Sequence, residues 1–145
     1  MRNCPRVKDK KKSRKGYASF DAVDPRDGLR WDLLVAHRTI DDIGSRQEPD
    51  RVKTLAYLVP HGVQHPTAIF QGLRDEDDRG LCYVSRPPHR YIGKAGHQVP
   101  PAPDRVFLVF VSPERVIYNW RWEACDPAEQ DLPAGHAERF DRRLL

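Results

Sequence analysis

The chain has 145 residues, of which 39% are hydrophobic and 32% charged, with a formal net charge of +4. This length suits one domain with a core of its own. No apolar run approaches the roughly 20 residues that cross a bilayer, so we expect no membrane partner. The three cysteines, Cys4, Cys82 and Cys125, are an odd number without framework spacing, which indicates reduced thiols in a cytoplasmic protein.

The charge is unevenly distributed along the chain. Residues 1–16 carry eight Lys or Arg and one Asp, a net charge of +7, whereas residues 17–145 carry 17 basic and 20 acidic residues, a net charge of −3. We therefore expect a disordered basic tail over 1–16 and a single domain over 17–145. The tail either attracts a polyanion such as RNA or only keeps the protein soluble. Its candidate nucleic-acid-binding residues are Lys10, Lys11, Lys12, Arg14 and Lys15.

Two segments in the first half of the domain favour helices. Residues 29–43 follow a turn at 24–28 and fit a strand, through alternating apolar residues, as well as a helix, through apolar residues at helical spacing. Their length favours the helix. Residues 49–59 begin with Pro49 and have apolar residues at i, i+3, i+4 and i+7, which predicts a helix that ends at Pro60.

Two β-hairpins are predicted in the second half. The first joins residues 67–74 to 81–86 through an acidic link. The second, residues 105–123, has an uninterrupted apolar first arm, typical of a strand covered on both faces, and a Ser-Pro-Glu turn. Its second arm alternates, and we expect the two tryptophans there to face the core rather than to stack on bases. One face would hold Val116, Tyr118, Trp120 and Trp122, and the other Ile117, Asn119, Arg121 and Glu123.

The remaining segments complete the predicted fold. Residues 87–104 contain five prolines and two glycines and are expected to form a long irregular loop. Residues 136–145 predict a short C-terminal helix. Because helices precede strands, the fold class is α+β, with N-terminal helices packed on a four-stranded antiparallel sheet of two hairpins and a short C-terminal helix.

Sequence motifs for phosphate loops, dinucleotide binding and hydrolase nucleophiles are absent. His61 and His65 have the spacing of metal ligands on a helix, but Pro60, Gly62 and Pro66 argue against a helix there. We therefore expect neither a metal nor a cofactor.

Charged side chains around the hairpins are the best candidates for a functional site. Between residues 81 and 122, six Lys or Arg oppose two acids, a net charge of +4. Metal-independent RNA cleavage needs a general base, a general acid and cations that stabilise the phosphorane. The alternative is an ordinary solvent-facing side of an amphipathic strand. The candidate catalytic residues are His65, Arg74, Arg86, Arg121 and Glu123, and Arg90 and Lys94 are further candidate contacts to nucleic acid.

The order of elements resembles the small bacterial ribonucleases grouped with barnase, RelE-type toxins and colicin nuclease domains. The residues that carry this resemblance are His37, His65, Arg74, Arg86, Tyr91, Arg121 and Glu123. The resemblance covers roughly residues 31–145. It implies helices before an antiparallel sheet, with catalytic side chains on the sheet face and in flanking loops. RelE-type proteins are strongly basic throughout, whereas residues 17–145 here are mildly acidic.

Three functional hypotheses follow. The leading one is a small cytoplasmic bacterial protein that engages RNA, as a toxin-type ribonuclease with an antitoxin partner or as an RNA-binding protein. In the enzyme, His65 or Glu123 would be the general base, and Arg74, Arg86 and Arg121 would stabilise the phosphate. The alternative is a non-enzymatic protein-interaction module with a basic polyanion-binding tail. The third is a domain that binds a small acidic ligand beside Arg121.

Overall fold

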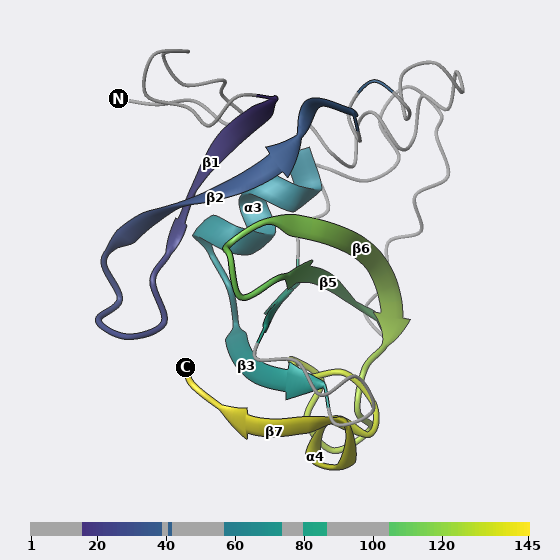
Figure 1. Ribbon diagram of the computed structural model, residues 1–145. Coiled ribbons are helices and arrows are strands. Elements are labelled where there is room, and N and C mark those ends of the chain that lie inside the picture. The colour runs from purple at the N-terminus through teal and green to yellow at the C-terminus, as the bar shows by residue number, and fades with distance from the viewer. Residues whose placement is uncertain (1–15, 39–40, 42–56, 74–79, 87–104) are drawn as a thin grey trace.

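The computed structural model describes residues 16–38, 41, 57–73, 80–86 and 105–145, which contain seven strands and two short helices (Figure 1). Two strands, β1 (Tyr17–Val23) and β2 (Arg30–Ala36), form an antiparallel pair. The other five form an antiparallel sheet in the order β6-β5-β4-β3-β7. They are β3 (Ala68–Leu73), β4 (Leu81–Ser85), β5 (Arg105–Val111), β6 (Ile117–Ala124) and β7 (Phe140–Arg143). The helices are α3 (Val59–Gln64) and α4 (His136–Arg139).

The prediction of an α+β fold with N-terminal helices is wrong, because the described residues are mostly in strands. β2 lies inside the segment 29–43 that was expected to be helical, and it pairs with β1 along its whole length. Alternate side chains of the two strands, among them Phe20, Leu33 and Val35, are buried in one core cluster. The alternation along residues 29–35 was thus the correct signal, because a neighbouring strand supplies the backbone hydrogen bonds that a helix would otherwise make internally.

The helix predicted over residues 49–59 lies almost entirely outside the described residues. The helix α3 begins where that segment ends, with Pro60 in its first turn, so Pro60 does not stop a helix. Proline fits the first turn because the N–H that it lacks has no intrahelical partner there. α3 contacts β1, β4 and β5. Neither described helix has the length and apolarity to cross a membrane.

Both predicted hairpins are confirmed, as β3–β4 and β5–β6. The C-terminal segment differs from its prediction, because the helix expected over residues 136–145 is limited to α4 and is followed by β7. This fifth strand pairs with β3, and the ring of Phe140 stacks on that of Phe70 at a centroid distance of 4.7 Å. Pairing with an existing sheet edge therefore overrides the helical spacing of the apolar residues.

A β-bulge changes the alternation expected along β6. The pairing with β5 shifts between Phe110 and Val111, so that Tyr118 is an extra residue on β6. Ile117 is therefore buried in the core cluster against which the two tryptophans of β6 pack, whereas Tyr118 is 45% exposed. The predicted faces are wrong for Ile117 and Tyr118. A one-residue bulge reverses the alternation of faces for the part of the strand that precedes it.

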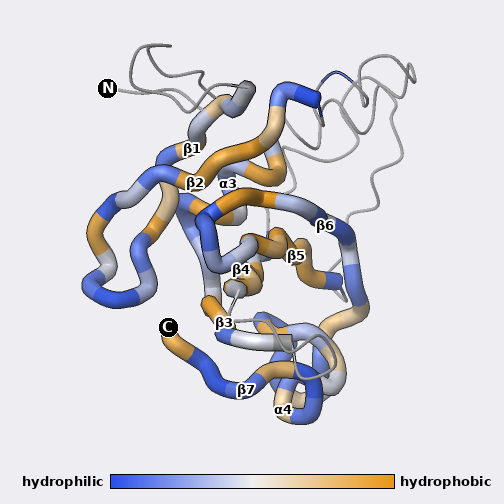
Figure 2. The backbone as a smooth tube through the Cα atoms, in the orientation of Figure 1, coloured by the Kyte–Doolittle hydropathy of each residue, from blue (hydrophilic) through white to orange (hydrophobic). Residues whose placement is uncertain are grey.

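The core lies on both faces of β5, as predicted from its uninterrupted apolar run. Six of its seven residues are buried, and Figure 2 shows it as a largely hydrophobic trace among more polar segments. One face packs against α3 and the β1–β2 pair through Phe107, Val109 and Val111. The opposite face packs with Phe70, Leu132 and Phe140 through Val106, Leu108 and Phe110.

Candidate anion-binding cleft

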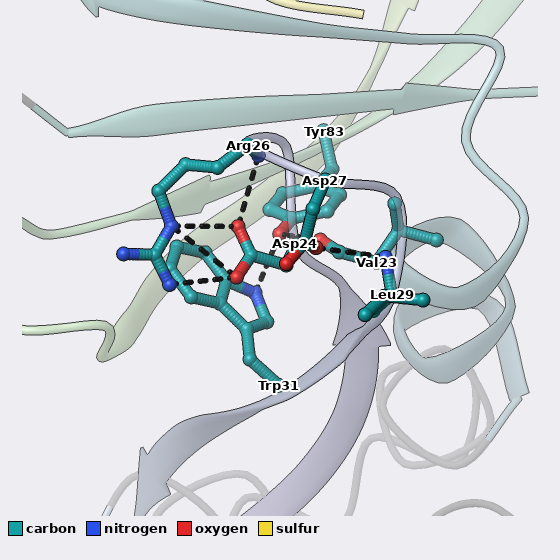
Figure 3. A network of polar contacts seen from close by, with 7 residues as sticks. All are labelled: Val23, Asp24, Arg26, Asp27, Leu29, Trp31 and Tyr83. Carbon is teal, nitrogen blue, oxygen red and sulfur yellow. Dashed lines mark hydrogen bonds and ion pairs between the residues drawn. The ribbon is translucent and has the colours of Figure 1, made fainter.

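The turn between β1 and β2 is built around a buried carboxylate. Asp24 is 4% exposed, and it accepts hydrogen bonds from the backbone N–H of Arg26 at 2.9 Å and from Nη2 of the same residue at 2.7 Å (Figure 3). The Gly28 N–H closes the turn by donating to the Asp24 carbonyl at 2.8 Å. The side-chain hydrogen bonds from Arg26 hold the pKa of Asp24 below its ordinary value. The carboxylate is therefore ionised and compensates the charge of Arg26.

Trp31, on β2, is fixed by a buried tyrosine of the larger sheet. Its Nε1 donates to the hydroxyl of Tyr83 at 2.9 Å, and this hydroxyl donates to the carbonyl of Val23 at 2.5 Å (Figure 3). Tyr83 is fully buried, and burial raises the pKa of its phenol, so the hydroxyl remains a donor. These two hydrogen bonds tie the β1–β2 pair to β4 and set the orientation of the indole.

Arg115 ends the turn between β5 and β6 in a left-handed backbone conformation. Its φ is 66°, and it is the one non-glycine residue of the described chain with a positive φ. Its N–H donates to the carbonyl of Ser112 at 2.9 Å, and its carbonyl accepts from the N–H of Leu34 on β2 at 2.8 Å. Hairpin turns of this kind usually have glycine at this position. An arginine there costs about 1 kcal/mol of backbone strain.

A cleft of about 710 Å³ opens between the β1–β2 turn, the β5–β6 turn and the end of β7. Figure 1 shows these three segments on the same side of the molecule. The charged and polar residues of the cleft are Arg26, Arg115, Arg142, Gln71 and Ser112. Its apolar residues include Trp31, Leu81 and Leu144. The cleft therefore combines cationic donors with an apolar surface, in a volume typical of ligand sites.

Two of the three arginine charges have no carboxylate partner in the described structure. Arg26 is paired with Asp24, whereas Nε of Arg142 donates to the neutral Oε1 of Gln71 at 2.9 Å. The guanidinium of Arg115 lies over the Trp31 ring and makes no hydrogen bond or ion pair with any described residue. The described lining contains no Asp or Glu, although the charge of Arg115 also helps to lower the pKa of the nearby Asp24. The three arginines and Asp24 together give a net charge of +2, and the unused N–H donors of Arg115 and Arg142 suit an anion.

Of the predicted catalytic residues, Arg121 and Glu123 lie together on β6. Nε of Arg121 donates to Oε2 of Glu123 at 2.6 Å, and Arg139 of α4 donates to both oxygens of the same carboxylate at 2.5 and 3.1 Å. Burial alone would raise the pKa of Glu123, but the hydrogen bonds from Arg139 and Arg121 outweigh it and lower this pKa. A carboxylate held between two guanidinium groups is a weak proton acceptor, and this cluster joins β6 to α4.

The other predicted site residues are placed elsewhere or are not described. His65 follows α3, with its ring centre 5.2 Å from that of His61. Arg86 forms an ion pair with Asp131 at 3.5 Å. The structure thus brings together Arg121 and Glu123 and gives His65 and Arg86 different partners. The predicted residues outside the described part of the chain are Arg74, Arg90, Lys94, Lys10, Lys11, Lys12, Arg14 and Lys15.

Sequence reasoning did not identify the residues of the cleft. Arg26, Arg115 and Arg142 are far apart in the chain, and only long-range strand pairing brings them to one place. One local signal was present, because Arg115 follows the Ser-Pro-Glu turn at a position that usually requires glycine. A charged residue at such a position is a sign of function.

Comparison with known proteins finds no family model, no curated protein and no solved structure that matches the chain. The resemblance to small bacterial ribonucleases depended on helices that precede the sheet, and β1 and β2 occupy that place instead.

Proposed function

We propose that this protein binds RNA without cleaving it, through the cleft lined by Arg26, Arg115 and Arg142. The observation that carries the proposal is the pair of guanidinium groups, Arg115 and Arg142, that share this cleft without a carboxylate partner in the described structure. Arginine binds phosphate through a rigid fork of donors and remains charged at every physiological pH. Contacts between such cations and phosphates provide most of the affinity of proteins for nucleic acids.

The backbone of Arg115 supports a functional role for its side chain. A glycine at this position would form the same turn without steric strain. The arginine there is oriented by the Trp31 ring, at 5.1 Å from the ring centre to its guanidinium carbon, and not by a carboxylate. Strain of this kind persists where the side chain is needed, which favours a ligand for this guanidinium.

The basic tail supplies a second, less specific attraction. Residues 1–16 carry a net charge of +7, and such a segment draws polyanions toward a protein in a salt-dependent manner. The tail and the cleft would therefore contribute separately to the affinity for RNA, and an experiment must distinguish the two contributions.

Cleavage is not part of the proposal, because it requires a general base and a general acid beside the phosphate. The described lining offers arginine, glutamine, serine, tryptophan, leucine and proline, and none of these side chains transfers protons readily near neutral pH. The ribonuclease hypothesis, the antitoxin partner and the roles of His65, Arg74, Arg86, Arg121 and Glu123 stay predictions.

Fluorescence anisotropy of a labelled single-stranded RNA tests the proposal, with the full chain and the double variant Arg115→Ala/Arg142→Ala. Removing two phosphate contacts should weaken binding by roughly tenfold or more and lower the salt dependence of the affinity. Arg38→Ala/Arg105→Ala is the control matched for charge, because both arginines are exposed and each lies at or just past the end of its strand, β2 or β5, away from the cleft turns. It should bind nearly as the wild type does.

Deletion of residues 1–16 completes the experiment. We expect the shortened chain to bind more weakly and still to depend on Arg115 and Arg142. If the double variant binds as the wild type does and the deletion alone abolishes binding, the tail is the binding element and the proposal is wrong.

A further inference from the structure

We infer that the cleft takes the terminal phosphate of an RNA strand, a phosphate monoester, in preference to the phosphodiesters within the strand. This inference rests on the proposed function and concerns the charge of the group that the cleft receives. Asp24 pairs with Arg26 and also interacts with the charge of Arg115, so the three arginines and this carboxylate together have a net charge of +2. A phosphate monoester carries about −1.5 to −2 at neutral pH, whereas each phosphodiester carries one negative charge.

The unused donors in the cleft match the same group. No described residue accepts a hydrogen bond from the guanidinium N–H groups of Arg115. Arg142 donates only from Nε, to Gln71, among the described residues. The Oε1 atom of Gln71 accepts this bond, so the amide NH₂ of Gln71 remains a donor. The Ser112 hydroxyl accepts from the Val116 N–H at 3.2 Å and can still donate. A monoester presents three strong acceptor oxygens to these donors, and an internal diester presents two non-bridging ones.

The apolar part of the cleft gives the terminal nucleoside a place beside the phosphate. Trp31, Leu81 and Leu144 are partly exposed and line the same space as the arginines. The guanidinium groups of Arg26 and Arg115 already lie over the Trp31 ring, so a terminal base would pack mainly on Leu81, Leu144 and the rest of the indole, through apolar contact that needs no sequence-specific hydrogen bonds. The volume of about 710 Å³ is within the range of small-ligand sites, roughly 300–1,000 Å³, which suits the end of a strand.

Competition against a labelled RNA with hydroxyl groups at both ends tests the inference. The unlabelled competitors are one short sequence with a 5′-phosphate, with a 3′-phosphate or with hydroxyl groups at both ends. One phosphate-ended form should compete roughly tenfold better than the hydroxyl-ended form, as expected for added charge-assisted hydrogen bonds. The difference should disappear in Arg115→Gln/Arg142→Gln and persist in Arg38→Gln/Arg105→Gln, which removes the same charge away from the cleft, with thermal unfolding showing that each variant is folded.

The outcomes distinguish a preference for terminal phosphate from RNA binding by the cleft as such. Equal competition by all three RNAs, with binding still lost in the double variant, would overturn the preference for terminal phosphate and leave the proposed function standing. Equal RNA binding by the wild type and the double variant would overturn both. A phosphoserine peptide that competes as well as the phosphate-ended RNA would overturn the assignment of the terminal phosphate to RNA.

Discussion

The guanidinium carbon of Arg115 lies 5.1 Å from the centre of the Trp31 ring, although the two residues belong to different hairpins. An aromatic ring attracts and orients a cation through its quadrupole, a contribution of about 0.5–1 kcal/mol at an exposed site. Unlike a carboxylate, the ring does not neutralise the charge. This relationship therefore orients Arg115 without using its N–H donors, which remain available to the anion that we propose for the cleft.

Substitution of Arg115 should separate backbone strain from binding. Asparagine adopts the left-handed conformation more readily than alanine. We therefore expect Arg115→Asn to be more stable than Arg115→Ala by about 0.5–1 kcal/mol in urea unfolding, while both variants lose RNA binding to the same extent. Equal stability of the two variants would contradict the role of the backbone, and wild-type affinity in either would contradict the role of the guanidinium.

The hydroxyl of Tyr83 should contribute to stability through the two partners that it satisfies. Tyr83→Phe removes the acceptor of the Trp31 Nε1–H and the donor to the Val23 carbonyl. An unsatisfied buried polar group costs about 1–3 kcal/mol, so the free energy of unfolding should fall by at least about 1 kcal/mol. Tyr118→Phe is the control, because this tyrosine is 45% exposed. Similar losses in the two variants would show that the Tyr83 hydroxyl has no special role.

Gly72 should be the more sensitive of two glycines with nearly the same backbone conformation. Gly72 and Gly28 have φ values of 74° and 75°, but a Cβ at Gly72 would lie 2.5 Å from a carboxylate oxygen of Asp141 on β7, whereas nothing lies within 4 Å at Gly28. Alanine at Gly28 should cost about 1–2 kcal/mol through its backbone alone. Alanine at Gly72 should cost more and disturb the β3–β7 pairing, which amide hydrogen exchange would detect.

The acid sensitivity of the fold should depend on Glu123. Its pKa is lowered in the folded state from the ordinary value of 4.5, so its contribution to stability is present above that value and is lost as the pH falls through the lower folded pKa. Glu123→Gln cannot titrate and should flatten the dependence of unfolding free energy on pH below about 5. Unfolding in urea at several pH values measures this slope, and a slope equal to that of the wild type would contradict the assignment.

Local sequence patterns predict two of the three hairpins in the described residues, β3–β4 and β5–β6. β5 was recognised because its apolar run has no polar interruption, and Arg121 and Glu123 were correctly placed on one face because they are two residues apart on one strand. The β1–β2 pair was missed because residues 29–35 fit two periodicities, and only the presence of β1 decides between them. The wrong face was predicted for Ile117 for a similar reason, because a bulge depends on how two strands pair and not on the sequence of one strand.

The residues of the cleft cannot be predicted from local sequence patterns, for a different reason. Its two arginines without a carboxylate partner lie in a turn and in the last described strand. Arg142 is ordinary in its own segment, and only its place after the Ser-Pro-Glu turn distinguishes Arg115. Their electrostatic character appears only when the contacts of Asp24, Gln71 and Trp31 show which charge is neutralised and which is not. A count of charges along the sequence does not contain this information.

The strand order β6-β5-β4-β3-β7 determines when, during synthesis, the cleft can exist. β7 is the last of the described strands to be made, yet it pairs with β3 from the middle of the chain, and Arg142 reaches Gln71 only through this pairing. A chain that emerges from the ribosome with its N-terminus first therefore completes the cleft after every other strand is available. A chain in which β7 has not yet paired with β3 would lack Arg142 at the cleft, so the RNA binding that we propose would require this pairing.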